Sequence, residues 1–71
     1  MIERITDNMN ESGYEGEWYS YIHNMRYYRV RLLDGEFTVW ESNYDSSEQH
    51  QIDTPEVRDV LRQVKDGLNE Q

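Results

Sequence analysis

Apolar and polar residues alternate through the middle of this chain, which is the pattern of half-buried β-strands. Residues 17–42 are rich in Trp, Tyr, Ile, Val, Thr and Phe, the residue types that favour strands. The dipeptide Asp34-Gly35 separates two such runs and predicts a two-residue hairpin turn with positive φ. That turn fixes the strand register, so we expect four facing pairs: Leu33 with Glu36, Leu32 with Phe37, Val30 with Val39, and Arg29 with Trp40.

The same alternation divides the hairpin into two faces. The face predicted to lie on the core carries Tyr28, Val30, Leu32, Phe37 and Val39. The opposite face carries Tyr27, Arg29, Arg31, Thr38 and Trp40. An earlier strand from Glu17 to about His23 would add either Tyr19 and Tyr21 or Trp18 and Ile22 to the core, depending on a turn near Asn24. The pattern leaves both choices open.

Helices are predicted near both ends of the sequence. Ile2, Ile5 and Met9 follow the i, i+3, i+7 spacing and indicate a short uncapped helix over residues 2–10. The run Asp53-Thr54-Pro55-Glu56 is typical of a helix start, with Thr54 as N-cap and Pro55 in the first turn. An apolar stripe then follows at Val57, Val60, Leu61 and Val64. Gly67 is expected to end this helix, Leu68 to fold back over the core, and residues 43–53 to form a polar connection.

These elements predict a single α+β domain over residues 1–71: a small antiparallel sheet of two or three strands, with the hairpin at Asp34-Gly35, flanked by a short N-terminal helix and a C-terminal helix. A chain of 71 residues has room for one core. Five Val, four Ile, four Leu and one Phe give only 14 such residues. Six Tyr and two Trp supply much of the remaining buried area.

Charge is strongly negative and unevenly distributed. The chain has 15 acidic and 7 basic residues, for a net charge of -8. Residues 1–17 contain five acids and one Arg, residues 18–35 contain three Arg and one Asp, and residues 36–53 contain five acids and no base. A small basic centre is therefore bracketed by acidic segments. Such a chain is expected to be repelled by nucleic acid and anionic membranes and attracted to basic protein surfaces.

Residues that could perform catalysis or hold a metal are sparse. His23 and His50 are far apart, and neither has a second ligand at helical spacing. No phosphate-binding glycine loop or nucleophile elbow is present, and with no Cys there is no disulfide or thiolate site. We therefore expect a protein that is not an enzyme, with no catalytic residue, metal or cofactor. The absence of a long apolar run or a signal-peptide pattern leads us to expect a cytoplasmic protein without membrane contact.

Two groups of residues are candidate binding surfaces. One is acidic and comprises Glu15, Glu17, Glu36, Glu41, Asp45, Glu48 and Asp53. The other is the sheet face with Tyr27, Arg29, Arg31 and Trp40, where Arg29 opposite Trp40 predicts a cation–π pair. Exposed Tyr, Trp and Arg are the residue types enriched at interaction hot spots.

In composition, the chain resembles the small acidic decoy proteins that mobile genetic elements use against nucleic-acid-handling enzymes, including anti-restriction and anti-CRISPR inhibitors. The resemblance rests on no motif and assigns no residue roles. It implies a phage-encoded nucleic-acid mimic, active in the host cytoplasm, that occupies a basic surface of an enzyme without binding nucleic acid itself. The alternative is a small homodimerising or adaptor module that binds through the Tyr27/Arg29/Trp40 face.

Overall fold

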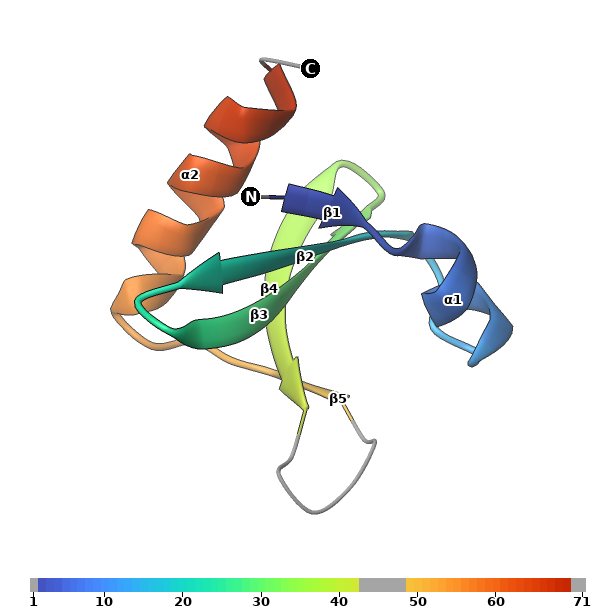
Figure 1. Cartoon of the computed structure of the whole chain (residues 1–71). Coiled ribbons are helices and arrows are strands. Elements are labelled where there is room, and N and C mark those ends of the chain that lie inside the picture. Colours follow the sequence, from blue (N-terminus) through green and yellow to red (C-terminus); the bar gives the residue numbers. More distant parts are fainter. Residues whose placement is uncertain (1, 43–48, 70–71) are drawn as a thin grey trace.

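The computed structural model describes residues 2–42 and 49–69, and within them one antiparallel sheet is flanked by two helices (Figure 1). The elements in chain order are β1 (Ile2–Arg4), α1 (Thr6–Glu11), β2 (Glu17–His23), β3 (Arg26–Leu33), β4 (Glu36–Ser42), β5 (Gln49–Gln51) and α2 (Glu56–Asn69). The strands lie side by side in the same order as in the sequence. The α+β class is confirmed. The expected number of strands is wrong, because the described residues form five.

The β3–β4 hairpin has the predicted register. Leu33 pairs with Glu36, Val30 with Val39 and Arg29 with Trp40. Asp34 and Gly35 have φ values of 53° and 78°, as a turn with two left-handed central residues requires. The handedness of this turn matches the twist of the strands, so short-range turn chemistry alone sets the pairing.

One face of the sheet packs against α2 and forms the main core. Its buried residues are Tyr21, Tyr28, Val30, Val39, Val60 and Val64. The predicted apolar stripe of α2 supplies Val60 and Val64, with Val57 and Leu61 packed beside them. The Tyr21 hydroxyl donates a hydrogen bond to Oε1 of Gln63, so this buried ring keeps a polar partner at the helix surface.

The structure resolves the open choice in the first strand. Tyr19 and Tyr21 pair with Val30 and Tyr28, and therefore face α2. Trp18 points to the other face, where it is also fully buried. Both faces of the sheet thus bury an aromatic residue from β2, a result that a single predicted core face does not anticipate. Ile22, on the same face as Trp18, is exposed.

The N-terminal helix predicted over residues 2–10 is wrong in its first half. Ile2–Arg4 form strand β1, which pairs with Tyr21, Ser20 and Tyr19 of β2, and the helix begins only at Thr6. Without β1, the outer edge of β2 would expose unpaired backbone groups, and an uncapped helix this short gains little stability alone. Ile2 consequently packs on the core under α2.

The polar connection predicted for residues 43–53 contains a further strand. Gln49–Gln51 form β5 and pair with Trp40, Glu41 and Ser42 of β4. The amide of Ile52 continues the ladder by donating to the carbonyl of Val39 at 2.9 Å. The hydrophobic pattern did not predict this strand because its side chains are polar. Backbone pairing, rather than side-chain burial, holds it against β4. The composition of the segment therefore gave no signal for β5.

Gly67 does not end the C-terminal helix, which continues to Asn69. Its function is close packing: a Cβ placed on Gly67 would collide with Cδ1 of Ile2. The missing side chain allows β1 to approach the last turns of α2. Leu68 packs against the core as expected. At the other end of the helix, the amide of Val57 donates to the Thr54 carbonyl at 3.0 Å, so the first turn starts where the sequence predicts.

Candidate interaction surfaces

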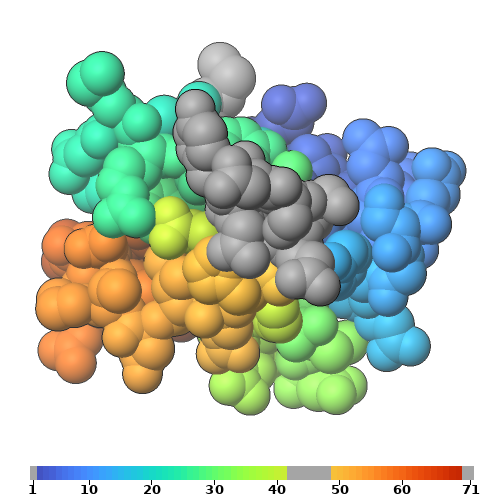
Figure 2. Space-filling model, turned by 90° about the horizontal axis from the view of Figure 1, so that it is seen from below, coloured from blue at the N-terminus to red at the C-terminus, as the bar shows by residue number. Residues whose placement is uncertain are grey.

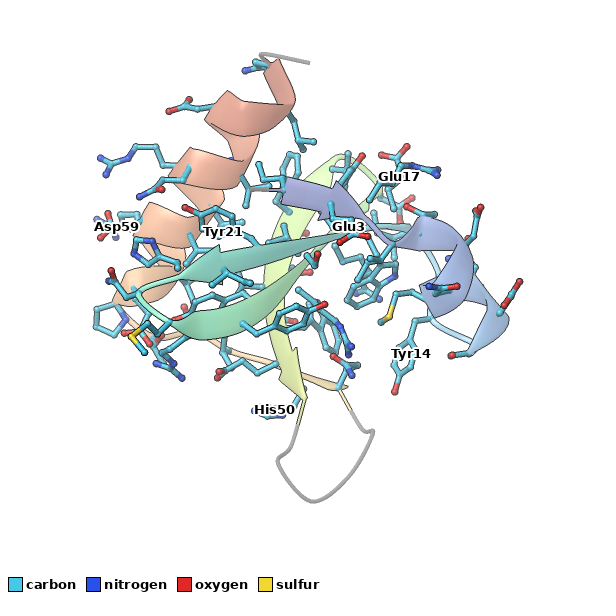
Figure 3. All side chains as sticks on the ribbon, in the orientation of Figure 1. Glu3, Tyr14, Glu17, Tyr21, His50 and Asp59 are labelled. Atoms are coloured by element: carbon cyan, nitrogen blue, oxygen red, sulfur yellow. The ribbon has the colours of Figure 1, made fainter. Side chains whose placement is uncertain are left out.

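Three residues of the predicted acidic surface, Glu15, Glu17 and Glu36, lie with other exposed acids at one end of the sheet, which we call the acidic end. It comprises six exposed residues: Asp7, Glu11, Glu15, Glu17, Asp34 and Glu36. Glu17 begins β2 opposite Leu32, and Glu36 begins β4 opposite Leu33. The strand register therefore brings both residues to the same end of the sheet. Asp34 lies in the turn between β3 and β4. Glu17 and the α1 region lie at the opposite side of the molecule from the first turns of α2, where Asp59 is found (Figure 3).

Short polar contacts hold α1 and the loop after it against β2, and so position the acids of the acidic end. The amide of Ile5 donates to the Trp18 carbonyl at 2.8 Å, and the Trp18 amide donates to Oγ1 of Thr6 at 3.0 Å. The side-chain amide of Asn10 donates to the carbonyls of Tyr14 and Gly16 at 2.7 and 3.1 Å. These bonds join the helix, the loop and the strand into one scaffold, which fixes the backbone from which Asp7, Glu11, Glu15 and Glu17 project.

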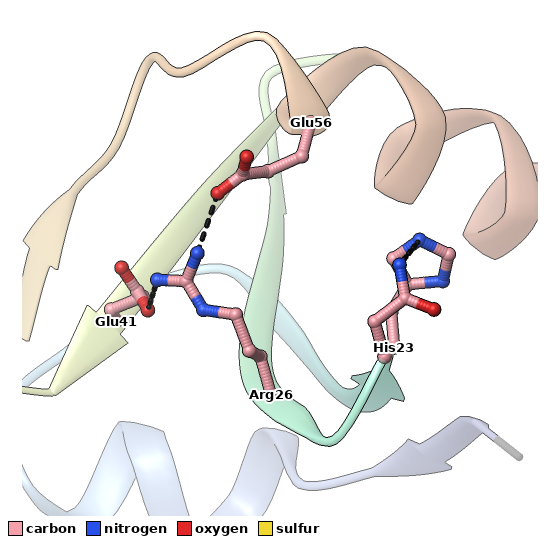
Figure 4. Close-up of polar contacts among 5 residues, drawn as sticks. His23, Arg26, Glu41 and Glu56 are labelled. Atoms are coloured by element: carbon pink, nitrogen blue, oxygen red, sulfur yellow. Dashed lines mark hydrogen bonds and ion pairs between the residues drawn. The ribbon is translucent and has the colours of Figure 1, made fainter.

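Glu41 lies near the end of β4 away from Glu36 and belongs to a different cluster, in which Arg26 lies between Glu41 and Glu56 (Figure 4). Arg26 donates from Nη2 to Glu41 at 2.9 Å and from Nη1 to Glu56 at 2.6 Å. The nearby Glu41 carboxylate raises the pKa of Arg26 above its ordinary value. Glu41 therefore has a partner within the fold, and it links β3 to β4 while Glu56 links β3 to α2.

Of the remaining predicted acids, the structure describes Asp53, which belongs to neither cluster. Asp53 is exposed in the segment before α2. Asp45 and Glu48 lie outside the described residues. The structure therefore brings together Glu15, Glu17 and Glu36 and separates Glu41 from them.

The predicted sheet face does carry Tyr27, Arg29, Arg31 and Trp40 together, but its expected cation–π pair is corrected. The guanidinium of Arg31 lies 4.8 Å from the ring centroid of Trp40 and 5.6 Å from that of Trp18. The guanidinium of Arg29 lies 5.5 Å from the Tyr27 ring. Residues directly opposite each other need not stack, because a long Arg side chain leans along its strand and reaches a diagonal neighbour.

The half of this face nearest α1 forms a second, smaller core. The rings of Trp18 and Trp40 meet edge to face at 5.7 Å, and Tyr14 meets Trp18 in the same way at 5.9 Å. Trp40 also donates from Nε1 to Oγ1 of Thr38 at 2.8 Å. Arg31 and the Trp rings are therefore engaged within the fold, and this half is not an open stacking surface.

The other half of the same face is open, and sequence analysis did not single out most of its residues. In the described part of the chain, three large apolar side chains are exposed: Ile22 at 61%, Met25 at 98% and Tyr27 at 49%. Ile22 and Tyr27 face each other across β2 and β3, and Met25 lies in the turn between them. The signal that could have located them is the hairpin register around Asn24-Met25, which the sequence left unsettled.

Both histidines and most of the possible metal ligands lie in the part of the chain that the structure describes. Among residues 2–42 and 49–69, no three His, Cys, Asp or Glu side chains are grouped so that they could hold a metal ion. His23 stacks on Tyr21 with ring centroids 5.9 Å apart, whereas His50 lies on β5 near the other edge of the sheet. Neither helix, as far as it is described, is long and apolar enough to cross a membrane.

Comparisons with protein-family models, with curated proteins and with solved structures found no match.

Proposed function

We propose that this chain is a non-enzymatic acidic protein that binds a basic surface of a nucleic-acid-handling protein and inhibits or regulates it. The observation that carries the proposal is the acidic end, whose six carboxylates are all exposed. In the described residues, the ion pairs are Arg26 with Glu41, Arg26 with Glu56 and Arg62 with Asp59, so none of them involves these six. Their charges are available to a partner.

Charge clustering of this kind favours a basic groove as its partner. A single exposed ion pair contributes little free energy because water and salt screen it. Several carboxylates acting together on a groove that normally holds nucleic acid replace the many weak phosphate contacts on which such grooves rely. Because the scaffold already fixes the backbone that carries the acids, little backbone entropy is lost on binding.

The resemblance in composition to mobile-element decoys supports the same proposal. A phage-encoded protein of this kind would act in the host cytoplasm by blocking the surface on which an enzyme holds DNA or RNA. The negative charge would steer the encounter and would make the association rate fall as salt concentration rises. The chain itself would not bind nucleic acid.

The test compares two double charge reversals. Glu17→Lys with Glu36→Lys alters the acidic end, and Asp59→Lys with Asp66→Lys alters exposed positions on α2. Both pairs change the net charge from -8 by the same +4, so non-specific charge effects are matched. Each tagged protein, with the unaltered chain, is used to capture proteins from extract of the host cell at low salt, followed by a high-salt wash and mass spectrometry.

The proposal expects a captured protein that is released by high salt, binds duplex DNA or RNA in isolation, and loses that nucleic acid when the chain is added. Reversal at the acidic end should weaken its affinity about tenfold or more, which corresponds to roughly 1.4 kcal/mol. Reversal on α2 should leave the affinity within about a factor of two or three. Equal effects of both reversals, or capture that is indifferent to salt, would contradict the proposal.

A second candidate is the homodimerising or adaptor module, which the half exposure of Tyr27 beside Arg29 favours. Its contact would be the open half of the sheet face, since Trp40 is already engaged with Arg31. Sedimentation velocity over a range of concentrations discriminates the two. A dimer that Tyr27→Ala dissociates would favour this candidate, and a monomer at all concentrations would favour the acidic inhibitor.

A further inference from the structure

Two of the three methionines lie in the part of the chain that the structure describes, and their surroundings differ. Met25 is 98% exposed in the turn between β2 and β3, whereas Met9 is 7% exposed on α1. The segment of residues 22–27 forms a projecting corner of the molecule at the end away from α1 (Figure 2). Because the chain has no Cys, its sulfur atoms are all methionine thioethers. Of the two that are described, only that of Met25 is open to a dissolved oxidant.

The turn that carries Met25 is held by its backbone. Asn24 and Met25 have φ values of 51° and 64°, and His23 pairs with Arg26 directly beyond them. Two left-handed residues between paired strands are the geometry of a two-residue hairpin turn. Since the Met25 side chain lies almost entirely in water, it adds very little packing to the fold. A change in its polarity therefore leaves the packed core unaltered.

Met9 is in the opposite situation. Its side chain is buried on α1, and its carbonyl accepts hydrogen bonds from the amides of Ser12 and Tyr14 at 3.1 and 3.0 Å. An oxygen added to its sulfur would place a polar group among buried residues, which disrupts packing. An oxidant in water reaches this sulfur only when α1 opens locally. The fold therefore shields Met9 and leaves Met25 accessible.

We propose that Met25 is a reversible oxidation site that reacts with peroxides while the chain stays folded. The sulfur donates a lone pair to one oxygen of hydrogen peroxide, the O–O bond breaks as the S–O bond forms, and the second oxygen leaves as water. The sulfur loses two electrons and the peroxide gains them. The product is methionine sulfoxide, which is polar, so the apolar end of the hairpin becomes polar without unfolding. A methionine sulfoxide reductase reverses the step with a dithiol, which becomes a disulfide as the added oxygen leaves as water.

The first test follows the oxidation of each methionine in the folded chain treated with hydrogen peroxide. Cleavage after Glu separates Met9 from Met25, because Glu11 and Glu17 lie between them, and mass spectrometry then measures the added oxygen in each peptide. In the folded chain, Met9 should react about tenfold or more slowly than Met25. In concentrated urea the two should react at the same rate, since unfolding removes the shield around Met9.

Met25→Leu is the matched control, because leucine keeps an apolar side chain of similar size without the sulfur. The peptide of residues 18–36 also contains Trp18, and its uptake of oxygen should disappear in this variant. Uptake that persists would assign the reaction to Trp18 and contradict the proposal. The same variant should melt within about 4 °C of the unaltered chain, as expected for a substitution at an exposed side chain.

The second test asks whether the modified chain stays folded and can be restored. The chain oxidised at Met25 should melt within about 4 °C of the untreated chain. Sulfoxide reductases of both epimer specificities, supplied with dithiothreitol, should return it to its original mass.

Four results would overturn the proposal. They are rates for Met9 and Met25 that differ by less than about tenfold in the folded chain, a larger fall in melting temperature, a sulfoxide that the reductases do not remove, and rates that still differ in urea. The last would assign the selectivity to the local sequence instead of burial. These measurements use the isolated chain, so their outcome is independent of the proposed function.

Discussion

The guanidinium of Arg31 lies 4.8 Å from the ring centroid of Trp40, on the face of the sheet opposite α2. The ring centroid of Trp18 lies 5.6 Å from the same guanidinium, and the two Trp rings also meet each other edge to face. The two Trp residues come from β2 and β4, and Arg31 lies on β3 between them. These contacts join three strands in a small second core. The attraction between the cation and the two rings explains why a charged side chain lies against Trp18 and Trp40.

Truncation of Arg31 should therefore destabilise the fold more than truncation of an ordinary surface arginine. Arg31→Ala removes the cation–π contacts and the packing of the side-chain stem, and we expect a loss of about 1–2 kcal/mol in the free energy of unfolding. Arg62→Ala, whose side chain is 70% exposed, should stay within about 0.5 kcal/mol of the unaltered chain. Urea denaturation followed by Trp fluorescence measures both. Equal losses would show that Arg31 contributes nothing beyond an exposed arginine.

Gly16 should be far less tolerant of substitution than Gly13. Both have left-handed backbones, with φ of 102° and 93°, so Ala at either position is strained by about 1–3 kcal/mol. A Cβ at Gly16 would also lie 3.0 Å from the Leu32 carbonyl oxygen and 3.1 Å from Cγ of Arg31, whereas none at Gly13 meets anything within 4 Å. Gly16→Ala should lower the free energy of unfolding by at least about 1 kcal/mol more than Gly13→Ala does, as measured by thermal or urea denaturation. Equal destabilisation would contradict the close contact.

The pH dependence of stability should show the burial of Tyr28. Desolvation of this ring raises the pKa of Tyr28 above the ordinary value of 10.0. As pH rises, the unfolded chain therefore loses the phenol proton before the folded chain does. The contribution of protonated Tyr28 to the free energy of unfolding is complete below pH 10, and it is lost as pH rises through the higher pKa of the folded chain. Urea denaturation between pH 8 and about pH 11 should show this loss, smaller in Tyr28→Phe. Tyr27→Phe, at the exposed neighbouring residue, should retain it, and identical profiles for the two variants would refute the assignment.

Gly67 and Ile2 should be energetically coupled. Ala is favoured over Gly inside a helix by about 1 kcal/mol, but a Cβ at position 67 collides with Cδ1 of Ile2. Gly67→Ala should therefore gain less than this in the unaltered chain. In the Ile2→Val variant, which lacks that atom, Gly67→Ala should raise the free energy of unfolding by the full amount of about 1 kcal/mol. A double-mutant cycle of thermal denaturation measures the coupling, and additive effects would show that β1 does not limit the position.

The candidate surfaces were only partly readable from the sequence. Exposed carboxylates follow from composition, but Glu17 and Glu36 come to the same end of the sheet through the β2–β3 register, which the sequence left open. That Glu41 instead pairs with Arg26 depends on β4 lying beside β3 and on α2 bringing Glu56 close. Met25 gave no signal as a side chain; its exposure became evident only from the turn it occupies.

The features that depend on neighbouring residues could be predicted without a structure: the Asp34-Gly35 turn, the register it sets between β3 and β4, and the apolar stripe of α2. Turn geometry and helical periodicity act over a few residues, so local chemistry is sufficient to specify them. Three features became known from the folded chain: Ile2–Arg4 pair as a strand, Gln49–Gln51 extend the other edge of the sheet, and Trp18 is buried on the face away from α2. These outcomes depend on which distant segment satisfies a sheet edge or covers a face, and that choice is made by the packing of the whole chain.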